Sequence, residues 1–168
     1  MTVHCRDTSD GQYCYAGQGA SSKFHDAKKF CNEVSGDLVT PKSSEDTTFI
    51  LNKFGRTYFW LGIENPNGDN TKWVYSYDLS EDISYTNWHQ PDEPNTNSEK
   101  CVQMRADGTW NDAHCDNSHK FICQFKVDPL SKFLTVYSNK YIIVKMVLVK
   151  SSFIVFLVAI CFDIPHFL

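Results

Sequence analysis

The sequence lacks several patterns that would assign it to a common functional class. Its seven cysteines form no Cys-x-x-Cys pair, and its histidines and cysteines do not follow zinc-finger spacing. Basic residues are not in excess, because 16 Lys and Arg stand against 20 Asp and Glu, for a net charge of −4. Acidic chains bind nucleic acid poorly, so we expect no nucleic-acid partner.

No arrangement typical of a nucleophilic enzyme stands out, neither a Ser-His-Asp set nor a reactive cysteine. Glu93 and Glu99 could serve as the acid and base of a glycosidase, which uses paired carboxylates. A catalytic acid needs an apolar pocket that raises its pKa, whereas these acids lie among Asn, Thr, Ser and Pro residues. We therefore expect a binding protein and not an enzyme.

The sequence also shows no clear membrane-spanning segment. Residues 141–162 are mostly apolar, but Lys145 and Lys150 interrupt them, and the remaining run of ten residues, 153–162, compares with about 20 needed for a span. A membrane anchor is therefore the less favoured interpretation of this tail. The first residues, Met1-Thr2-Val3-His4-Cys5, contain no apolar segment of a signal peptide.

Cysteines and aromatic residues are abundant. Seven cysteines suggest a disulfide framework and hence an extracellular, oxidising setting, and we give this more weight than the missing signal peptide. Cys5 and Cys14 flank a polar turn, where a local disulfide could close a hairpin. Aromatic residues make up 14% of the chain, which favours a packed core. We expect one domain over residues 1–127 and an apolar tail over 128–168 outside it.

Two helices are expected from apolar residues at helical spacing. The first has Ser21 or Ser22 as its N-cap, places Cys31 on its apolar face and ends at Gly36. The second begins at Ser43 or Ser44, carries Glu45 and Asp46 in its first turn, and ends at Gly55. The partner of Cys31 should then come from elsewhere in the core.

Short apolar or alternating runs indicate strands between these helices and after them. Strands are expected at residues 38–39, 58–63, 73–75, 101–104 and 120–125. Residues 76–97 show little periodicity and many turn formers, so we expect a long loop there, and long loops in compact domains are usually functional.

Carboxylates and side-chain amides are concentrated between Trp88 and Asp112. Their oxygens are hard ligands, which suit calcium and its shell of six to eight oxygens. They suit zinc poorly, because zinc prefers sulfur or imidazole. On composition alone, a polar surface loop rich in turn formers is the alternative interpretation.

Several short motifs follow one another along the chain: Trp60-Leu61-Gly62-Ile63, Glu93-Pro94-Asn95, Glu99 before Cys101, Trp110-Asn111-Asp112, and the cysteines Cys31, Cys115 and Cys123. Their order and spacing resemble a C-type lectin-like domain of the long form, over about Cys5 to Phe125. The resemblance implies an α+β fold in which two helices pack on small antiparallel sheets beside a long binding loop. It also implies the disulfides Cys5–Cys14, Cys31–Cys123 and Cys101–Cys115, which leaves Cys161 outside the domain.

A calcium-dependent sugar site also follows from the resemblance. Glu93, Asn95, Glu99 and Asn111 would offer side-chain oxygens to one calcium ion, the expected cofactor, and Asp112 would offer its carboxylate and backbone carbonyl. Two vicinal sugar hydroxyls would complete the shell, each also bonding to protein groups. The implied partners are glycans.

Two neighbouring triplets predict different sugars. In this family Glu93-Pro94-Asn95, with Pro94 cis, is the signature of mannose-type sugars such as mannose, fucose or N-acetylglucosamine. Gln90-Pro91-Asp92 has the galactose-type order. We favour the first, because relatives usually begin the triplet four residues after the equivalent of Trp88, and because galactose sites tend to place an aromatic residue soon after the triplet.

Two further points stay open in the sequence. Asn65 and Asp69 match positions of an auxiliary calcium site in relatives, but Lys100 occupies a third position, where an ammonium opposes calcium. The main alternative to sugar binding is a calcium-independent domain of the same fold that binds a protein. Nothing in the sequence encodes an oligomerising coiled coil, so the number of subunits is not predicted.

Overall fold

The computed structural model of the chain describes residues 3–8, 11–68, 72–96 and 98–127. The chain divides into two units, Met1–Lys126 and Val127–Leu168. Asp69 of the expected auxiliary site, the tail over 128–168 and Cys161 all lie outside the described residues.

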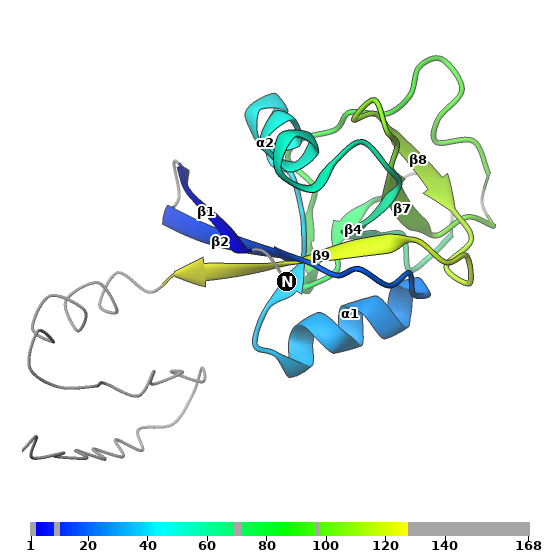
Figure 1. Cartoon of the computed structure of the whole chain (residues 1–168). Helices are drawn as coiled ribbons and strands as arrows, with labels where there is room; N and C mark the ends of the chain where they lie inside the picture. Colours follow the sequence, from blue (N-terminus) through cyan, green and yellow to red (C-terminus); the bar gives the residue numbers. More distant parts are fainter. Residues whose placement is uncertain (1–2, 9–10, 69–71, 97, 128–168) are drawn as a thin grey trace, which may run out of the picture. The chain divides into compact units, whose positions relative to one another are not determined.

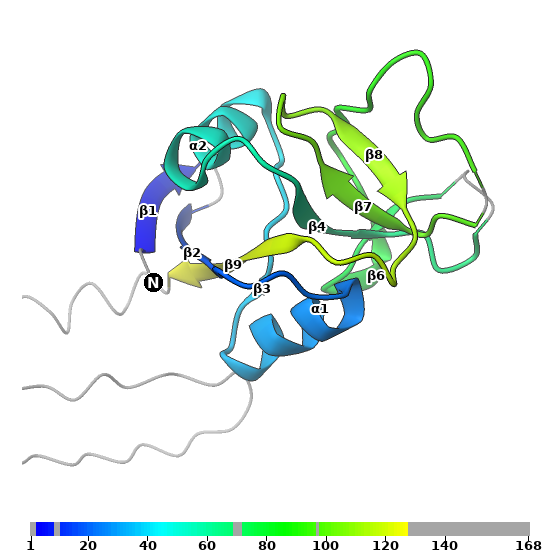
Figure 2. The same cartoon turned by 45° about the vertical axis from the view of Figure 1, so that its right-hand side comes forward.

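The described residues form two helices and nine strands, which confirms the predicted α+β class. The helices α1 (Phe24–Glu33) and α2 (Ser44–Phe54) lie on opposite sides of the last strand (Figures 1 and 2). The strands are β1 (Val3–Thr8), β2 (Gly11–Gly17), β3 (Asp37–Leu38), β4 (Phe59–Glu64), β5 (Val74–Tyr75), β6 (Asp78–Asp82), β7 (Cys101–Met104), β8 (Trp110–Ala113) and β9 (Lys120–Val127).

One connected sheet carries these strands in the order β1-β2-β9-β4-β5-β6, with β3 beside β9, β7 beside β4 and β8 beside β7. The β4–β9 pair is parallel, and β7 and β8 form an antiparallel hairpin in which Val102 lies opposite Asp112. Glu99 lies just before β7, and Asn111 and Asp112 lie in β8. The hairpin therefore brings these parts of the expected binding site side by side (Figure 2).

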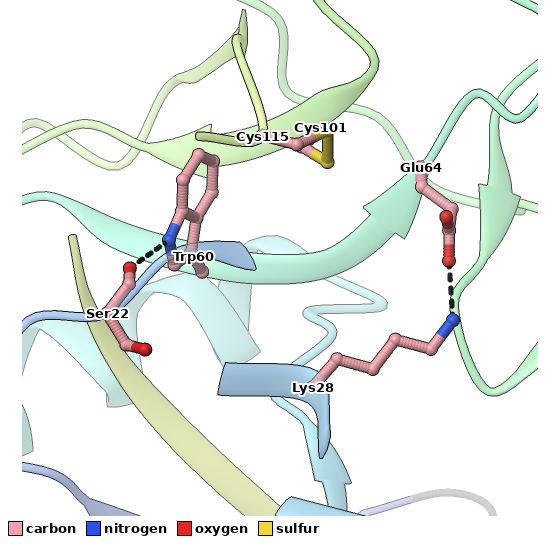
Figure 3. Close-up of a disulfide and its surroundings, with 6 residues drawn as sticks. All are labelled: Ser22, Lys28, Trp60, Glu64, Cys101 and Cys115. Carbon is pink, nitrogen blue, oxygen red and sulfur yellow. Dashed lines mark hydrogen bonds and ion pairs between the residues drawn. A yellow bond between two sulfur atoms is a disulfide. The ribbon is translucent and has the colours of Figure 1, made fainter. Parts of the chain in front are cut away.

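β4, which covers most of the strand predicted at residues 58–63, lies at the centre of the fold. All six of its residues are buried, and alternate side chains enter two different hydrophobic clusters. Gly62 allows this packing, because a Cβ at that position would lie 2.7 Å from the backbone oxygen of Leu38. The neighbouring Trp60 is fully buried, and its indole adjoins the Cys101–Cys115 disulfide (Figure 3).

The predicted cap of the first helix is wrong. α1 begins at Phe24 with Lys23 at the N-cap position, and no side chain caps it. The carbonyl oxygen of an N-cap residue accepts the first hydrogen bond of the helix. The Ser22 carbonyl oxygen instead accepts a hydrogen bond of 2.8 Å from the indole Nε1 of Trp60 (Figure 3). A tertiary contact to β4 therefore displaces the start of the helix toward its C-terminus.

The end of α1 also differs from the prediction in detail. Ser35 adopts the left-handed conformation, with φ 63°, and the Gly36 N–H donates to the carbonyl of Cys31 at 2.8 Å. This bonding pattern is that of a Schellman motif, in which the left-handed residue is commonly glycine. Gly36 is instead needed for packing, because a Cβ there would lie 2.6 Å from the ring of Phe125.

The cap of α2 provides a direct test of local stability. The helix begins at Ser44, one of the two predicted starts, and the Ser43 side chain caps it by accepting a hydrogen bond of 3.2 Å from the backbone N–H of Asp46. We expect Ser43→Ala to lower the free energy of unfolding by about 1 kcal/mol. Urea denaturation measures this. Ser44→Ala changes an exposed neighbour and is the matched control; equal losses in both variants would contradict the capping role.

Part of the predicted long loop is wrong, because residues 78–82 form strand β6. All five residues of β6 are exposed, and the strand lies at the edge of the sheet beside β5. An exposed edge strand needs no apolar alternation, so the sequence gives no periodic signal for it.

Three disulfides join the cysteine pairs that the family resemblance implied. Cys31–Cys123 connects α1 to β9 across 92 positions in sequence, and both cysteines are fully buried. Closing so long a loop stabilises a fold by about 4–5 kcal/mol in the chain-entropy picture. The disulfide framework predicted from composition is thus confirmed.

Candidate functional site

The candidate site lies between the β6–β7 loop and β8. Trp110 at the start of β8 fixes the loop, since its N–H donates to the carbonyl of Asn87 at 2.8 Å and its carbonyl accepts from His89 at 2.9 Å. The Glu93 N–H in turn donates to the carbonyl of His89 at 3.0 Å. These bonds hold the loop acids beside the strand that carries Asn111 and Asp112.

Asp112 is the centre of the site. It is 0% exposed, and its carboxylate accepts hydrogen bonds from the backbone N–H of Asn95, at 3.2 and 3.3 Å, and of Thr96, at 3.3 Å. The Asn95 side-chain amide donates to Glu93 Oε2 at 2.8 Å. Glu93 is 9% exposed, whereas Asn95 is exposed. The loop triplet is therefore bound to β8 through a buried carboxylate.

Asn111 and Glu99 complete the set of residues that the sequence singled out. The Asn111 amide donates to the backbone carbonyl of Asp112. Glu99 is partly buried, and its Oε1 lies 3.9 Å from Nε2 of the exposed His114. Hydrogen bonds and electrostatic effects thus link all five expected calcium ligands across the loop and β8.

Negative charge accumulates in this group. Burial of the carboxyl, the hydrogen bond with Asp112, and the charges of Asp112 and Glu99 raise the pKa of Glu93 to about 7, although Arg105 partly offsets them. Burial and the charge of Asp112 likewise raise the pKa of Glu99, against the influence of His114. Among the described residues, the only ion pair that reaches these carboxylates is that of His114 with Glu99. Such a site attracts a cation.

The donor set fits calcium better than zinc. It offers carboxylate, amide and backbone carbonyl oxygens and no free sulfur. Within the described part of the chain, three His, Cys, Asp or Glu ligand atoms lie within 4.8 Å of one another only at His25, Cys101 and Cys115, where both sulfurs belong to a disulfide. Glu93, Glu99 and Asp112 therefore do not bring three ligand atoms together within that distance, although Glu93 and Asp112 are hydrogen-bonded.

The two competing triplets have different environments. Gln90, Pro91 and Asp92 are all exposed. Glu93 is buried, and its partner Asn95 bonds to Asp112 through the backbone. The Glu93–Pro94 peptide bond is cis, as expected, and the Gln90–Pro91 bond is cis as well, which the sequence did not predict.

The surroundings of the expected auxiliary site are occupied by internal contacts. Asn65 is fully buried; its Oδ1 accepts from the Gly68 N–H at 2.8 Å, and its own N–H donates to the carbonyl of Lys100 at 2.8 Å. Glu64, the neighbouring acid, pairs with Lys28 of α1 at 2.7 Å (Figure 3). The auxiliary calcium site, which the sequence left open because Lys100 opposes it, stays untested.

Sequence reasoning missed three contributors to the site. Arg105 offsets the negative charge around Glu93, Thr96 binds Asp112 through its backbone N–H, and His114 pairs with Glu99. None of them belongs to a motif, and their contacts depend on how the loop folds onto β8.

Comparison with known proteins identifies the family. Residues 20–125 match the profile of the lectin C-type domain. The chain is 30% identical over 134 residues to C-type lectin domain family 3 member A of Bos taurus, covering 76% of this chain and 66% of that protein. It is 29% identical over 117 residues to C-type lectin domain family 10 member A of Homo sapiens, covering 66% and 36%. The chain therefore matches less than two thirds of either relative.

Solved structures agree in fold. The carbohydrate-recognition domain of the mouse scavenger receptor C-type lectin superposes with a TM-score of 0.63 at 28% identity, over 74% of this chain and 95% of that one. The cow domain of CD23, solved in the presence of a GlcNAc2Man3 oligosaccharide, gives 0.59 at 28% identity, over 69% and 89%. A calcium-independent type II antifreeze protein gives 0.62 at 22% identity, over 75% and 97%, which shows the fold alone.

The family match covers more than half of the chain, and it includes both helices, the candidate loop and β8. The disulfides and the Trp110-Asn111-Asp112 motif lie where the fold requires them, in the core and at the end of the loop. Together with the neighbouring structures, these observations show that the chain belongs to the family of C-type lectin domains.

Proposed function

We propose that this domain binds glycans through one calcium ion held by Glu93, Asn95, Glu99, Asn111 and Asp112. The observation that carries the proposal is the buried Asp112 carboxylate with two further acids beside it and no Lys or Arg ion pair to them among the described residues. Buried charges require a counter-charge, and oxygen donors of this kind suit calcium. The cow CD23 domain solved with an oligosaccharide supports a glycan as ligand.

The residues of the site would act on the sugar in two ways. A bound calcium ion supplies positive charge and coordination positions for two vicinal hydroxyls. The Glu93 carboxylate accepts the proton of one hydroxyl, and the Asn95 amide, which is exposed, donates to a hydroxyl oxygen. Each hydroxyl thereby keeps both its donor and its acceptor role, so that little is lost when it leaves water.

The order of acid and amide predicts mannose-type selectivity. Exchanging them with the double substitution E93Q/N95D reverses which hydroxyl geometry finds matched donors and acceptors. We expect the preference to move from mannose toward galactose by at least roughly tenfold, because an unmatched polar group costs about 1–3 kcal/mol. Competition by free mannose and free galactose for a labelled glycoprotein measures the change.

The same assay on the unmodified chain tests the proposal itself. The oxidised full chain should be retained on mannose–agarose with calcium and released by EDTA, while galactose–agarose retains less. Retention on galactose alone would mean that Gln90-Pro91-Asp92 is the active triplet. Retention that survives EDTA would contradict the calcium mechanism.

The second candidate is a calcium-independent domain that binds a protein. The similarity in fold to a calcium-independent antifreeze protein shows that this architecture does not require the ion. The retained acid and amide residues favour the calcium site over this candidate. A melting temperature that calcium does not change, with no retention on either resin, would favour the protein-binding candidate.

We also propose an extracellular location, since three disulfides form and persist in oxidising compartments. Within the described residues, neither helix has the length and apolar character to cross a bilayer. Oxidised chain recovered from the medium of producing cells would support this location, and retention in the cytosol with free thiols would contradict it.

A further inference from the structure

The disulfide Cys101–Cys115 differs from the fully buried Cys31–Cys123 in its surroundings. Cys101 is 0% exposed, at the start of β7, whereas Cys115 is only partly buried, just after β8. Solvent therefore reaches part of Cys115 but none of Cys101, which makes Cys115 the more accessible end of the bond. Both sulfurs of Cys31–Cys123, in contrast, lie in residues that are 0% exposed.

An imidazole lies against this disulfide. A ring nitrogen of His25 and the two sulfurs all lie within 4.8 Å of one another, and His25 is itself exposed. His25 belongs to the first turn of α1, whose Phe24 N–H donates to the carbonyl of Cys115 at 3.0 Å. A helix N-terminus and a neighbouring histidine both stabilise a thiolate.

Several charged groups surround His25 at this corner. Lys23 and Asp116 pair with each other at 2.9 Å; this pair and, more weakly, the charges of His25 and His114 lower the pKa of the Asp116 carboxyl. Asp26 follows His25 on α1. No hydrogen bond or ion pair joins His25 to a carboxylate among the described residues.

From this geometry we propose that Cys115 is a site of thiol exchange, at which a low-molecular-weight thiol opens the Cys101–Cys115 disulfide. The thiolate of the incoming molecule attacks the Cys115 sulfur and forms a mixed disulfide there. The bond to Cys101 breaks, and its electron pair leaves on the Cys101 sulfur. The imidazolium of His25 gives its proton to that sulfur, which yields a neutral thiol in an apolar site where a thiolate is costly.

Opening this bond acts on the candidate binding site. Glu99 lies two residues before Cys101, and Asp112 three residues before Cys115, so the disulfide ties together the chain segments that carry two acids of the site. We expect the opened form to hold its acids less firmly and to bind calcium more weakly. This consequence rests on the proposed function, whereas the exchange step does not.

Mass spectrometry tests the exchange step. The folded, oxidised full chain, with Cys161 alkylated beforehand, is treated with reduced glutathione, quenched in acid, alkylated and digested. We expect glutathione on Cys115, a free thiol at Cys101, and exchange at Cys31–Cys123 at least roughly a hundredfold slower, because that bond is buried. Glutathione found on Cys101, or equal rates at the two disulfides, would overturn the proposal.

Two variants test whether His25 donates the proton to the Cys101 sulfur. In His25→Ala and His25→Gln we expect opening of Cys101–Cys115 to slow by about tenfold, while the exposed Cys5–Cys14 bond, in the same molecule, exchanges at an unchanged rate. Circular dichroism checks that both variants are folded. An unchanged rate at Cys101–Cys115 in the folded variants would refute proton donation by His25.

A calcium titration by thermal shift, before and after glutathione treatment, separates the two proposals. A calcium response that weakens when Cys115 is modified supports the coupling to the binding site. A mixed disulfide at Cys115 in a chain that never responds to calcium would refute the coupling and the proposed function, and the exchange step would stand.

Discussion

Asp112→Asn should abolish the calcium response of the domain. The change removes one negative charge from the centre of the proposed site, where the carboxylate is 0% exposed. Calcium affinity depends strongly on the number of charged ligands, so we expect a loss of at least about a hundredfold. The rise in melting temperature on adding calcium, and retention on mannose–agarose, should both disappear.

Stability must be separated from calcium binding in this variant. The Asp112 carboxylate accepts from two backbone N–H groups, and an asparagine can present its amide donors to them, so the ion-free variant should itself melt lower. Asp92→Asn is the matched control, because it removes the same charge from an exposed acid that directly precedes Glu93 in the sequence. An equal loss of calcium response in both variants would contradict the assignment of the site.

Much of the fold could be predicted because its strongest signals are local. The apolar run that became β4 is buried on both faces, and Ser43 and Gly55 mark the ends of α2. The start of α1 could not be predicted, because Ser22 bonds to Trp60, 38 positions away. Strand β6 could not be predicted either, since an exposed edge strand carries no apolar pattern.

The candidate site likewise has features that the sequence could predict and features that it could not. The family resemblance singled out the acids and amides of the loop and β8, because motifs report residue types at fixed separations. The burial of Glu93 beside an exposed Asn95, and the effect of Arg105 on its charge, depend on packing between segments distant in sequence. The sequence could therefore predict which groups are present, but not how negative the site is.

That negative environment makes calcium binding strongly dependent on pH. The raised pKa of Glu93, about 7, means that the ion-free site holds a proton at mildly acidic pH. Calcium needs the ionised carboxylate, so each bound ion displaces this proton, and affinity falls about tenfold for each pH unit below 7. We expect roughly a hundredfold weaker binding at pH 5 than at pH 8. Glu99, whose pKa is also raised, acts in the same direction.

The stability of the ion-free domain should change with pH in the opposite sense. Because the folded state holds the Glu93 proton more tightly than the unfolded chain, whose carboxyl has the ordinary value of 4.5, folding gains from protonation and stability falls as pH rises from about 4.5 to 7. Calcium reverses this loss, so its effect on melting temperature should be larger at pH 8 than at pH 5.5. Calorimetric titration in buffers of different ionisation enthalpy counts the protons released.

His114 is the competing source of such a pH dependence, because its ring lies 3.9 Å from Glu99 and carries a charge only when it is protonated. His114→Ala separates the two. If Glu93 carries the effect, the variant keeps the fall in calcium affinity between pH 8 and 5 and the release of a proton on binding. If the affinity of the variant becomes independent of pH, the histidine is responsible, and the site holds its acids ionised without the ion.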